Sequence, residues 1–318
     1  MDFCYNAAPI TKISTLARIL RIEESALLEL ADRASACYKI GSREKKADGT
    51  FRITFDAKKP LKSIQARIQC LILRNITYPC YLHGGIRDPQ NPRDYVSSAR
   101  THQSSRWLVC EDIRSFFPSV RPEVIQGIWV GLCHFSPEVA GCLTKLTTKD
   151  DCLPQGAKTS TALANLVFWR DEPALFRYLR ARGINYSRLV DDINCSSFNR
   201  LRGSELTDTV RRLHAMCAKY GLSIKRQKHA VFVSGGTMKT TNLVVNSLVS
   251  LPHEERSSIR RQVRQLEVTA EVAANRSTVL YAKNYNSLSG KVGKLKRFHP
   301  TEGNNLRRRL RVILPPKV

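Results

Sequence analysis

Residues 185–197 read NYSRLVDDINCSS. Two aspartates, Asp191 and Asp192, stand side by side between apolar residues, in a chain with 27 Asp and Glu against 52 Lys and Arg. The two apolar half-runs predict a β-hairpin with the carboxylates at its tip. Such a pair often marks only a solvated turn. Against a core, however, unpaired carboxylates are costly, and a divalent cation is their natural compensation.

A second carboxylate ends another apolar run, RWLVCEDI at residues 106–113. Because neighbouring side chains on a strand point to opposite faces, only one of Glu111 and Asp112 can face the pair, and we expect Asp112 to do so. Carboxylates from two adjacent strands could hold two Mg²⁺ ions about 3.5–4 Å apart, which is the geometry of in-line phosphoryl transfer. The sequence therefore predicts a polymerase-type active site.

The composition points to a polyanionic partner. The 318 residues carry a formal net charge of +25, which favours nucleic acid; a merely soluble basic protein and a protein on an anionic membrane are the alternatives. Ten cysteines are scattered without a CxxC motif, which argues against zinc and against a secreted disulfide framework. No signal segment and no membrane-spanning stretch is recognisable, so we expect a cytoplasmic protein without a membrane partner.

Strands interleaved with helices, followed by a basic helical end, predict an α+β fold. In the first part of the chain we expect two short helices in 11–36, a hairpin over 38–56 around Asp48–Gly49, and a helix from about Leu61 with Ile64, Ile68 and Leu71 on one face. A loop over 83–95, one long helix over 157–183 and a helix over 206–222 that stops at Gly221 follow. Strands are expected at 230–235 and 241–251, and helices from His253 onward.

Five motifs occur in the order that reverse transcriptases have: EDIRSFFPSV, LPQGAKTSTALAN, YSRLVDDI, GLSIKRQKHAVF and TTNLVVN. Upstream, SARTHQSSRWLVCEDI is similar to the Asn-Ala-x-x-His element of bacterial retron reverse transcriptases. The chain resembles that family from about Tyr38 to Asn246, with a basic, thumb-like tail beyond. The chain departs from the family's pattern at three places. Ser98 stands where the family has an asparagine, Leu189 where it has an aromatic residue, and Thr241–Asn242 where it has Thr-Gly.

The resemblance implies a right-hand polymerase fold with fingers, a palm of antiparallel sheet plus helices, and a helical thumb. The expected divisions are an N-terminal helical segment at 1–36, fingers at 37–105, the first catalytic strand of the palm at 106–120, a helical connection between fingers and palm at 121–152, the rest of the palm at 153–250 and a basic helical thumb at 251–318.

By the same resemblance Asp112, Asp191 and Asp192 are the catalytic, metal-binding carboxylates, and the main chain of Ile113 helps to hold the metal of the triphosphate. Phe117 stands where the family has an aromatic gate, whose ring would clash with a ribonucleotide 2′-hydroxyl. The alternative for Phe117 is an ordinary core phenylalanine, and we expect the preceding residue, Phe116, to be one.

Further residues are expected to bind the incoming dNTP. Gln155 would contact the nucleotide, or else belong to an ordinary turn, and Lys228 would give a proton or a counter-charge to pyrophosphate. Arg52, with Lys46 as a weaker second, lies on the hairpin where the family clamps the triphosphate, unless this face is merely solvated. His102 is expected to be structural or RNA-contacting rather than catalytic.

The basic C-terminal part fits a thumb that grips duplex backbone and structured RNA through phosphate contacts. The residues expected to make these contacts are Arg260, Arg261, Arg264, Lys294, Lys296, Arg297, Arg307 and Arg308.

The resemblance implies an RNA-directed DNA polymerase that uses dNTPs and two Mg²⁺ ions to copy part of its cognate non-coding RNA into a small RNA-linked DNA (msDNA). It also implies a role in anti-phage defence with a separate effector protein. Two alternatives stay open. One is another bacterial defence or group II intron-like reverse transcriptase, and the other is a catalytically idle RNA-binding scaffold of the same fold.

Overall fold

The computed structural model describes residues 2–45, 49–199 and 203–316. The chain divides into two compact units. The larger comprises Met1–His102 and Arg106–Val231, and the smaller comprises Gln103–Ser105 and Phe232–Val318. None of the helices in the described ranges combines the length and the apolar character that crossing a bilayer needs.

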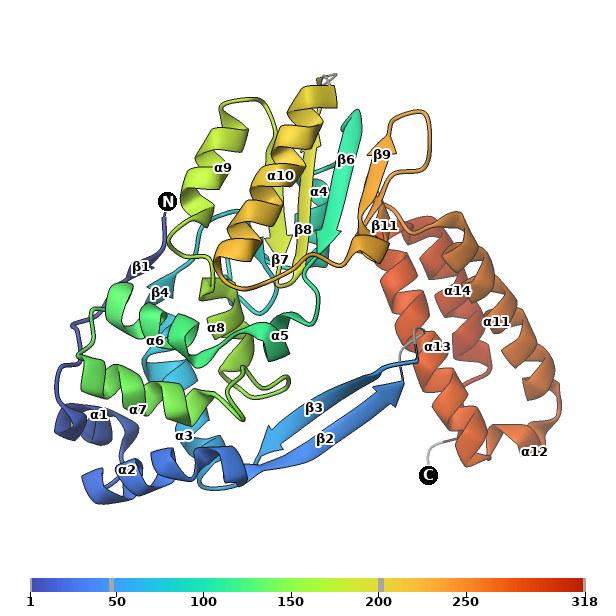
Figure 1. Cartoon of the computed structure of the whole chain (residues 1–318). Helices are drawn as coiled ribbons and strands as arrows, with labels where there is room; N and C mark the ends of the chain where they lie inside the picture. Colours follow the sequence, from blue (N-terminus) through green and yellow to red (C-terminus); the bar gives the residue numbers. More distant parts are fainter. Residues whose placement is uncertain (1, 46–48, 200–202, 317–318) are drawn as a thin grey trace. The chain divides into compact units, whose positions relative to one another are not determined.

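A five-stranded sheet lies at the centre of the larger unit, with the strand order β5-β7-β8-β6-β9 (Figure 1). β7 (Asn185–Leu189) and β8 (Asp192–Ser197) form the predicted antiparallel hairpin. β8 also pairs antiparallel with β6 (Trp107–Asp112), in a register that sets Asp112 directly opposite Asp192. The strand pairing thus brings together two carboxylates that lie far apart in the sequence.

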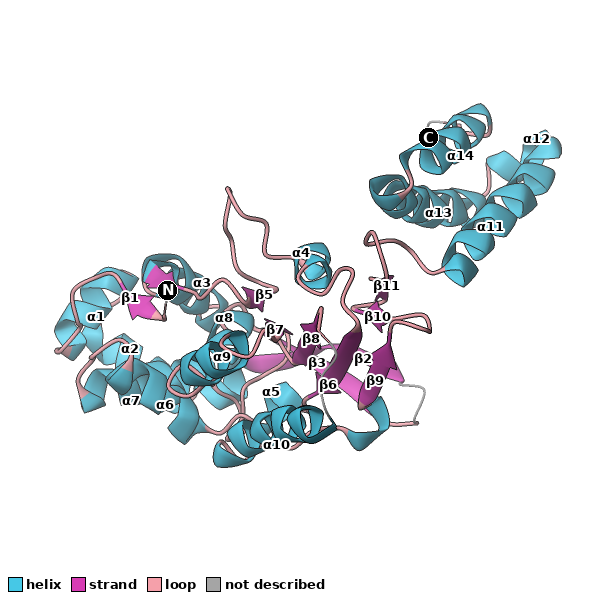
Figure 2. Cartoon of the chain, turned by 90° about the horizontal axis from the view of Figure 1, so that it is seen from above, coloured by secondary structure: helices cyan, strands magenta, loops and turns pink. Residues whose placement is uncertain are grey.

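Helices cover both faces of this sheet. α9 (Glu172–Arg180) and α10 (Gly203–Lys219) lie on one face, and α4 (Tyr95–Arg100) lies on the other (Figure 2). At the sheet edges, β5 (Leu82–His83) runs parallel to β7, and β9 (Ala230–Val233) neighbours β6.

The N-terminal part of the larger unit is helical. The two helices predicted in 11–36 are confirmed as α1 (Ile13–Leu20) and α2 (Glu24–Asp32). They pack with three further helices, α3 (Leu61–Leu71), α6 (Pro122–Gly131) and α7 (Pro137–Thr147). The remaining short elements of the unit are β1 (Cys4–Tyr5) paired with β4 (Ile76–Thr77), α5 (Phe116–Ser119), α8 (Ser160–Leu166) and the 3₁₀ turns Ala34–Cys37, Leu73–Asn75 and Arg226–Lys228.

The apolar face expected of α3 is correct except at its end. Ile64 and Ile68 are buried, whereas Leu71, which was expected on the same face, is 42% exposed. The helix ends at this residue and the chain turns, so that Ile72 takes the buried position instead.

The predicted hairpin over 38–56 is confirmed as β2 (Tyr38–Lys45) and β3 (Phe51–Ala57), which form a separate two-stranded sheet. A register shift between Ile40 and Arg43 interrupts the pairing. Lys46 and Asp48 lie outside the described residues.

Residues 157–183 do not form the single helix that the sequence predicted. They form α8 and α9, which are separate helices. Pro173 lies in the first turn of α9, where a missing N–H is tolerated; within a continuous helix it would remove a hydrogen bond and clash with the preceding turn.

The smaller unit is mainly a bundle of α11 (His253–Glu271), α13 (Val279–Phe298) and α14 (Pro300–Val312), with the short α12 (Ala273–Arg276). The expected helical end is thus confirmed. The strand expected over 241–251 is not: only β10 (Lys239–Thr240) and β11 (Leu243–Val244) pair, because Thr241 and Asn242 turn the chain with positive φ.

Candidate active site and nucleic-acid interface

Three aspartates from two adjacent strands meet at the turn between β7 and β8. Asp112 ends β6, and its carboxyl group lies within hydrogen-bonding distance of the carboxyl group of Asp192. The backbone N–H of Ile113 donates to the carbonyl oxygen of Asp191 at 3.0 Å, which ties the end of β6 to the turn. The three carboxylates that the sequence singled out therefore lie together.

The site concentrates negative charge. Burial, and to a lesser degree the charge of Asp112, raises the pKa of Asp191. Burial together with the charges of Asp191 and Asp112 raises the pKa of Asp192 to about 7. Lys228 forms an ion pair with Asp112. Burial lowers the pKa of this lysine, but the hydrogen bond to Asp112 and the aspartate charges outweigh burial, so its pKa is raised. One ammonium group cannot neutralise three carboxylates.

The donor set fits Mg²⁺. Within the described residues, no three His, Cys, Asp or Glu side chains are already spaced as a complete ion cage. Mg²⁺ does not require one, because it binds through one or two carboxylates and completes its shell with water and substrate phosphates. Asp112, Asp191 and Asp192, together with the main chain at Ile113, provide the hard oxygen ligands that such an ion prefers.

Glu111 points away from this cluster. Its carboxylate is buried on the opposite side of β6, where Oε1 is hydrogen-bonded to Nδ1 of His229 at 2.8 Å and to Nε2 of His214 at 3.3 Å. The two histidines had no signal of their own in the sequence. Strand alternation alone could have indicated that an inward-facing Glu111 needs polar partners.

Two residues expected to bind the dNTP contact each other. The side-chain amide of Gln155 faces the guanidinium group of Arg52, and its oxygen accepts from Nη2 at 2.6 Å and Nε at 2.8 Å. The backbone N–H of Phe55 donates to the carbonyl oxygen of Gln155 at 2.7 Å. Gly156 has φ +105°, and a Cβ there would lie 2.9 Å from the carbonyl oxygen of Phe55, so glycine is required for this close approach. The loop at 154–156 is therefore attached to β3.

The two neighbouring phenylalanines differ as the sequence suggested. Phe116 is buried and stacks on Phe168 with centroids 6.1 Å apart. Phe117 is only half-buried and meets Phe116 edge-on, with centroids 6.0 Å apart. Its ring thus keeps a free surface close to the end of β6, as a gate for the sugar requires.

His102 is fully buried under the sheet. Its ring nitrogens are hydrogen-bonded to the hydroxyl groups of Ser196 at 2.8 Å and Ser187 at 2.7 Å, and Ser187 also meets Ser98 at 3.0 Å. Burial lowers the pKa of His102 to about 3, so the ring is neutral. This favours the structural alternative for His102, since a fully buried ring has no surface with which to touch RNA.

Comparison with known proteins agrees with this geometry. Residues 44–269 match the family described as "Reverse transcriptase (RNA-dependent DNA polymerase)". The retron Se72 reverse transcriptase of Salmonella heidelberg (strain 579083-10) is 34% identical over 98% of this chain and 82% of its own length. The chain belongs to the retron reverse transcriptases. The retron Ec48 reverse transcriptase of Escherichia coli is 27% identical over 97% of this chain and 77% of its own.

A solved telomerase structure from Candida albicans, in complex with a fragment of telomeric RNA, aligns over 87% of this chain and 63% of the other, with 12% identity and a TM-score of 0.49. That likeness is too remote to add to the assignment. The family itself gives this retron reverse transcriptase its α+β polymerase fold and its activity as an RNA-directed DNA polymerase.

The cations expected to bind nucleic acid fall into two groups in the smaller unit of this reverse transcriptase. Some already bond inside the bundle: Arg260 with Glu302, Arg264 with Glu267, Lys294 with Glu255, and Arg307 with Ser289. Others are exposed and have no ion-pair partner among the described residues, namely Arg261, Lys296 and Arg308. Arg297 is exposed as well. The side chains of the second group are accessible to solvent.

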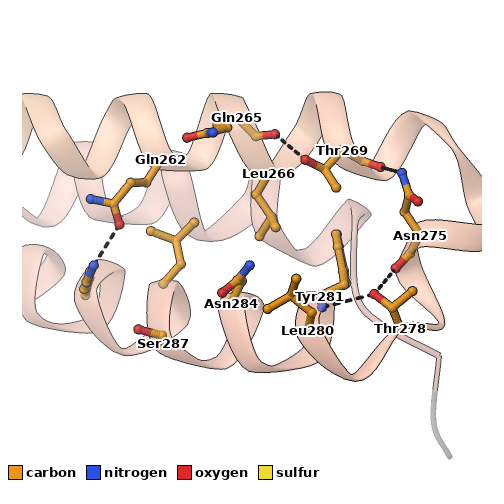
Figure 3. A pocket seen from close by; sticks show the side chains of 12 residues that line it. Gln262, Gln265, Leu266, Thr269, Asn275, Thr278, Leu280, Tyr281, Asn284 and Ser287 are labelled. Carbon is orange, nitrogen blue, oxygen red and sulfur yellow. Dashed lines mark hydrogen bonds between the residues drawn. The ribbon is translucent and has the colours of Figure 1, made fainter.

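An open groove of about 570 Å³ runs between α11 and α13 of the same bundle (Figure 3). Amide and hydroxyl side chains line it together with Lys291 and with the apolar side chains of Leu266, Leu280 and Leu288. Lys291 reaches across the groove and donates to Oε1 of Gln262 at 2.8 Å. The side chains of Asn284 and Ser287 face the groove from α13 (Figure 3).

Proposed function

We propose that this reverse transcriptase copies part of a structured non-coding RNA into a small single-stranded DNA that stays linked to the RNA. The observation that carries the polymerase chemistry is the meeting of Asp112, Asp191 and Asp192 at one turn. The similarity to retron reverse transcriptases along almost the whole chain supports the class of template.

The side chains around this turn have distinct roles in the proposal. Bound by Asp112, Asp191, Asp192 and the main chain of Ile113, two Mg²⁺ ions would supply activation of the 3′-hydroxyl and neutralisation of the triphosphate. Lys228, which already contacts Asp112, offers a proton or a positive charge to the leaving pyrophosphate.

The nucleotide is selected and held by residues of other elements. Arg52 binds the triphosphate with its guanidinium fork, which suits two phosphate oxygens at once. Gln155 orients that fork through their mutual contact. Phe117 closes the space beside C2′ of the sugar and so favours deoxynucleotides.

Replacing one carboxylate tests the chemistry. Asp192→Asn is expected to abolish Mg²⁺-dependent incorporation of dNTPs while RNA binding survives. Asp32→Asn is the matched control, since Asp32 is an exposed aspartate on α2 that forms an ion pair with Lys145. If the wild-type protein incorporates no nucleotide with Mg²⁺, dNTPs and the RNA that copurifies with it, the chain is an RNA-binding scaffold.

The template and product are tested by sequencing the nucleic acid that copurifies with the protein. A single structured RNA joined to a DNA copy of part of it supports the retron function. A DNA product whose mobility is unchanged by ribonuclease, or synthesis on any primed template, indicates another class of reverse transcriptase.

The proposal includes a place in anti-phage defence, with the DNA-linked RNA and a separate effector protein as partners. Its support is the similarity to retron enzymes alone. Plating of phages on cells with the wild-type or the Asp192→Asn chain, each expressed with its neighbouring genes, tests it. Equal plating on both would remove the defence role.

A further inference from the structure

We propose that Arg188 is a positioning residue, which holds the turn that carries Asp191 and Asp192 in its active shape through the carbonyl oxygen of Val190. The inference rests on the catalytic role proposed above for the aspartates. It assigns a function to an arginine whose side chain is fully buried.

The turn needs to be held. Val190 lies between β7 and the aspartates with φ +59°, a left-handed conformation that a β-branched side chain rarely adopts. Such a conformation persists only when its surroundings hold it, and residues of this kind gather at active sites. Gly84 packs against the same turn, since a Cβ there would lie 2.9 Å from both Leu189 and Val190 side-chain atoms.

Arg188 is fully buried and bonds in three directions. Its Nη1 donates to the carbonyl oxygen of Val190 at 2.9 Å. Its Nη2 donates to the carbonyl oxygen of Asn165, in the last turn of α8, at 2.9 Å. Its Nε and Nη2 donate to the two carboxylate oxygens of Glu172 at 2.6 and 2.8 Å. The guanidinium group therefore joins the turn to α8 and α9.

The partner of the arginine is itself immobile. Glu172 is fully buried in the first turn of α9, and it also accepts a hydrogen bond from the hydroxyl group of Tyr186 at 2.6 Å. Two consecutive carbonyl groups of the turn thus accept hydrogen bonds. Arg188 donates to the carbonyl oxygen of Val190, and the N–H of Ile113 donates to that of Asp191. Both contacts act on the backbone and do not involve the side chains of Asp191 and Asp192.

A purely structural role would be an ion pair between Arg188 and Glu172. Such buried pairs contribute little net stability and are often replaceable by uncharged groups of similar volume. The bond to Val190 is not needed for that pair, yet it reaches a residue with positive φ directly before Asp191. The geometry therefore points to control of the turn rather than to stability.

The test removes the pair as a unit, in the variant Arg188→Met with Glu172→Gln, so that no charge is left buried alone. We expect an intact fold by circular dichroism and unchanged RNA binding. The turnover number should fall by roughly 10²-fold with little change in the KM for dNTPs, as for a misplaced reacting group. Calorimetric titration of the free protein with Mg²⁺ alone should show weaker binding, by about tenfold.

Leu143→Ala is the control, because this leucine is fully buried in α7 and does not touch the turn. It should lower the melting temperature and leave the Mg²⁺ affinity unchanged. A double variant with wild-type turnover and wild-type Mg²⁺ affinity would overturn the proposal. So would losses that merely follow the melting temperature, as in the Leu143→Ala protein.

A second substitution addresses the strain directly. Glycine adopts positive φ without cost, so Val190→Gly added to the double variant should restore part of the turnover. If it restores none, Arg188 does not act through the conformation of Val190. The Mg²⁺ titration needs no catalysis, so it separates this inference from the proposed function, which fails if Asp192→Asn remains active.

Discussion

Asp192 couples the active site to pH. Its pKa of about 7 lies above the ordinary value of 3.8, so the folded, metal-free protein binds this proton more tightly than the unfolded chain. The resulting stability is fully present below about pH 4 and is lost as the pH rises through about 7. Because a metal ligand must be deprotonated, Mg²⁺ binds better above that value.

We therefore expect the melting temperature of the protein in EDTA to fall between about pH 5 and about pH 8, and Mg²⁺ to raise it more at the higher pH. Scanning calorimetry with and without Mg²⁺ measures both effects. Asp192→Asn should weaken the dependence on pH. If that variant keeps the wild-type profile, another group is responsible.

Phe117 makes a separate prediction about substrate choice. Phe117→Ala removes the half-buried ring beside the end of β6, so ribonucleotides should gain about ten- to hundredfold in kcat/KM relative to deoxynucleotides. Steady-state incorporation of paired rNTPs and dNTPs measures the ratio. Phe198→Ala is the control, since Phe198 is 54% exposed beyond the end of β8. If Phe117→Ala leaves the ratio of kcat/KM for ribonucleotides and deoxynucleotides unchanged, Phe117 is a core residue and not a gate.

Sequence reasoning at this scale worked where local geometry was enough. Strand alternation separates Asp112 from Glu111, and both side chains point as that rule requires. The partners of Glu111 and the bonds of Arg188 could not be read in the same way. They come from elements distant in the sequence, and no spacing along the chain encodes such contacts.

The hairpin of β2 and β3 has two chemically different faces. Arg52 lies on the face that meets Gln155, whereas Arg43 pairs with Ile53 on the other face and lies over the ring of Phe51 at 4.0 Å. The two arginines therefore form a matched pair with which the proposed binding of the triphosphate by Arg52 can be tested.

Arg52→Ala should raise the KM for dNTPs about tenfold, the effect of losing one charged hydrogen-bonding group. Arg52→Lys should restore little, because an ammonium group lacks the guanidinium fork. Arg43→Ala should leave the KM near the wild-type value. Steady-state kinetics on a primed RNA template gives all three values, and equal effects of both arginines would contradict a specific clamp.

Whole elements were predictable where their signals are periodic. The two hairpins, at 38–57 and 185–197, follow from alternation and turn residues. The boundary between α8 and α9 was missed although Pro173 marks it, because the apolar spacing continues across the break. The strand expected at 241–251 was wrong because its apolar, β-branched residues are typical of a strand, whereas Thr241 and Asn242 turn the chain.

The whole molecule carries a net charge of +25, and this charge should dominate RNA affinity. If roughly 6–10 phosphates are neutralised, affinity should fall about 10³–10⁵-fold between about 50 and 200 mM salt. Filter binding or fluorescence anisotropy over a salt series measures the slope. A flat salt profile would contradict phosphate binding.

The dependence of RNA affinity on salt can also be predicted for individual exposed cations of the smaller unit. Changing Arg261, Lys296 and Arg308 to glutamine should reduce the salt slope by about one for each residue. Arg309→Gln is the control, because Arg309 bonds to Glu267 across the bundle at 2.7 Å. It should lower the melting temperature and keep the slope. The sequence supplied the number of cations, but only the structure separates those that are already paired.

The register between β6 and β8 has a consequence for biosynthesis. Asp112 is translated long before Asp192, and the two carboxylates meet only when the later strand has paired with the earlier one. A nascent chain that has emerged only as far as β7 lacks Asp191 and Asp192, so it cannot form the proposed metal site. β8 must therefore be translated before the proposed copying reaction can begin.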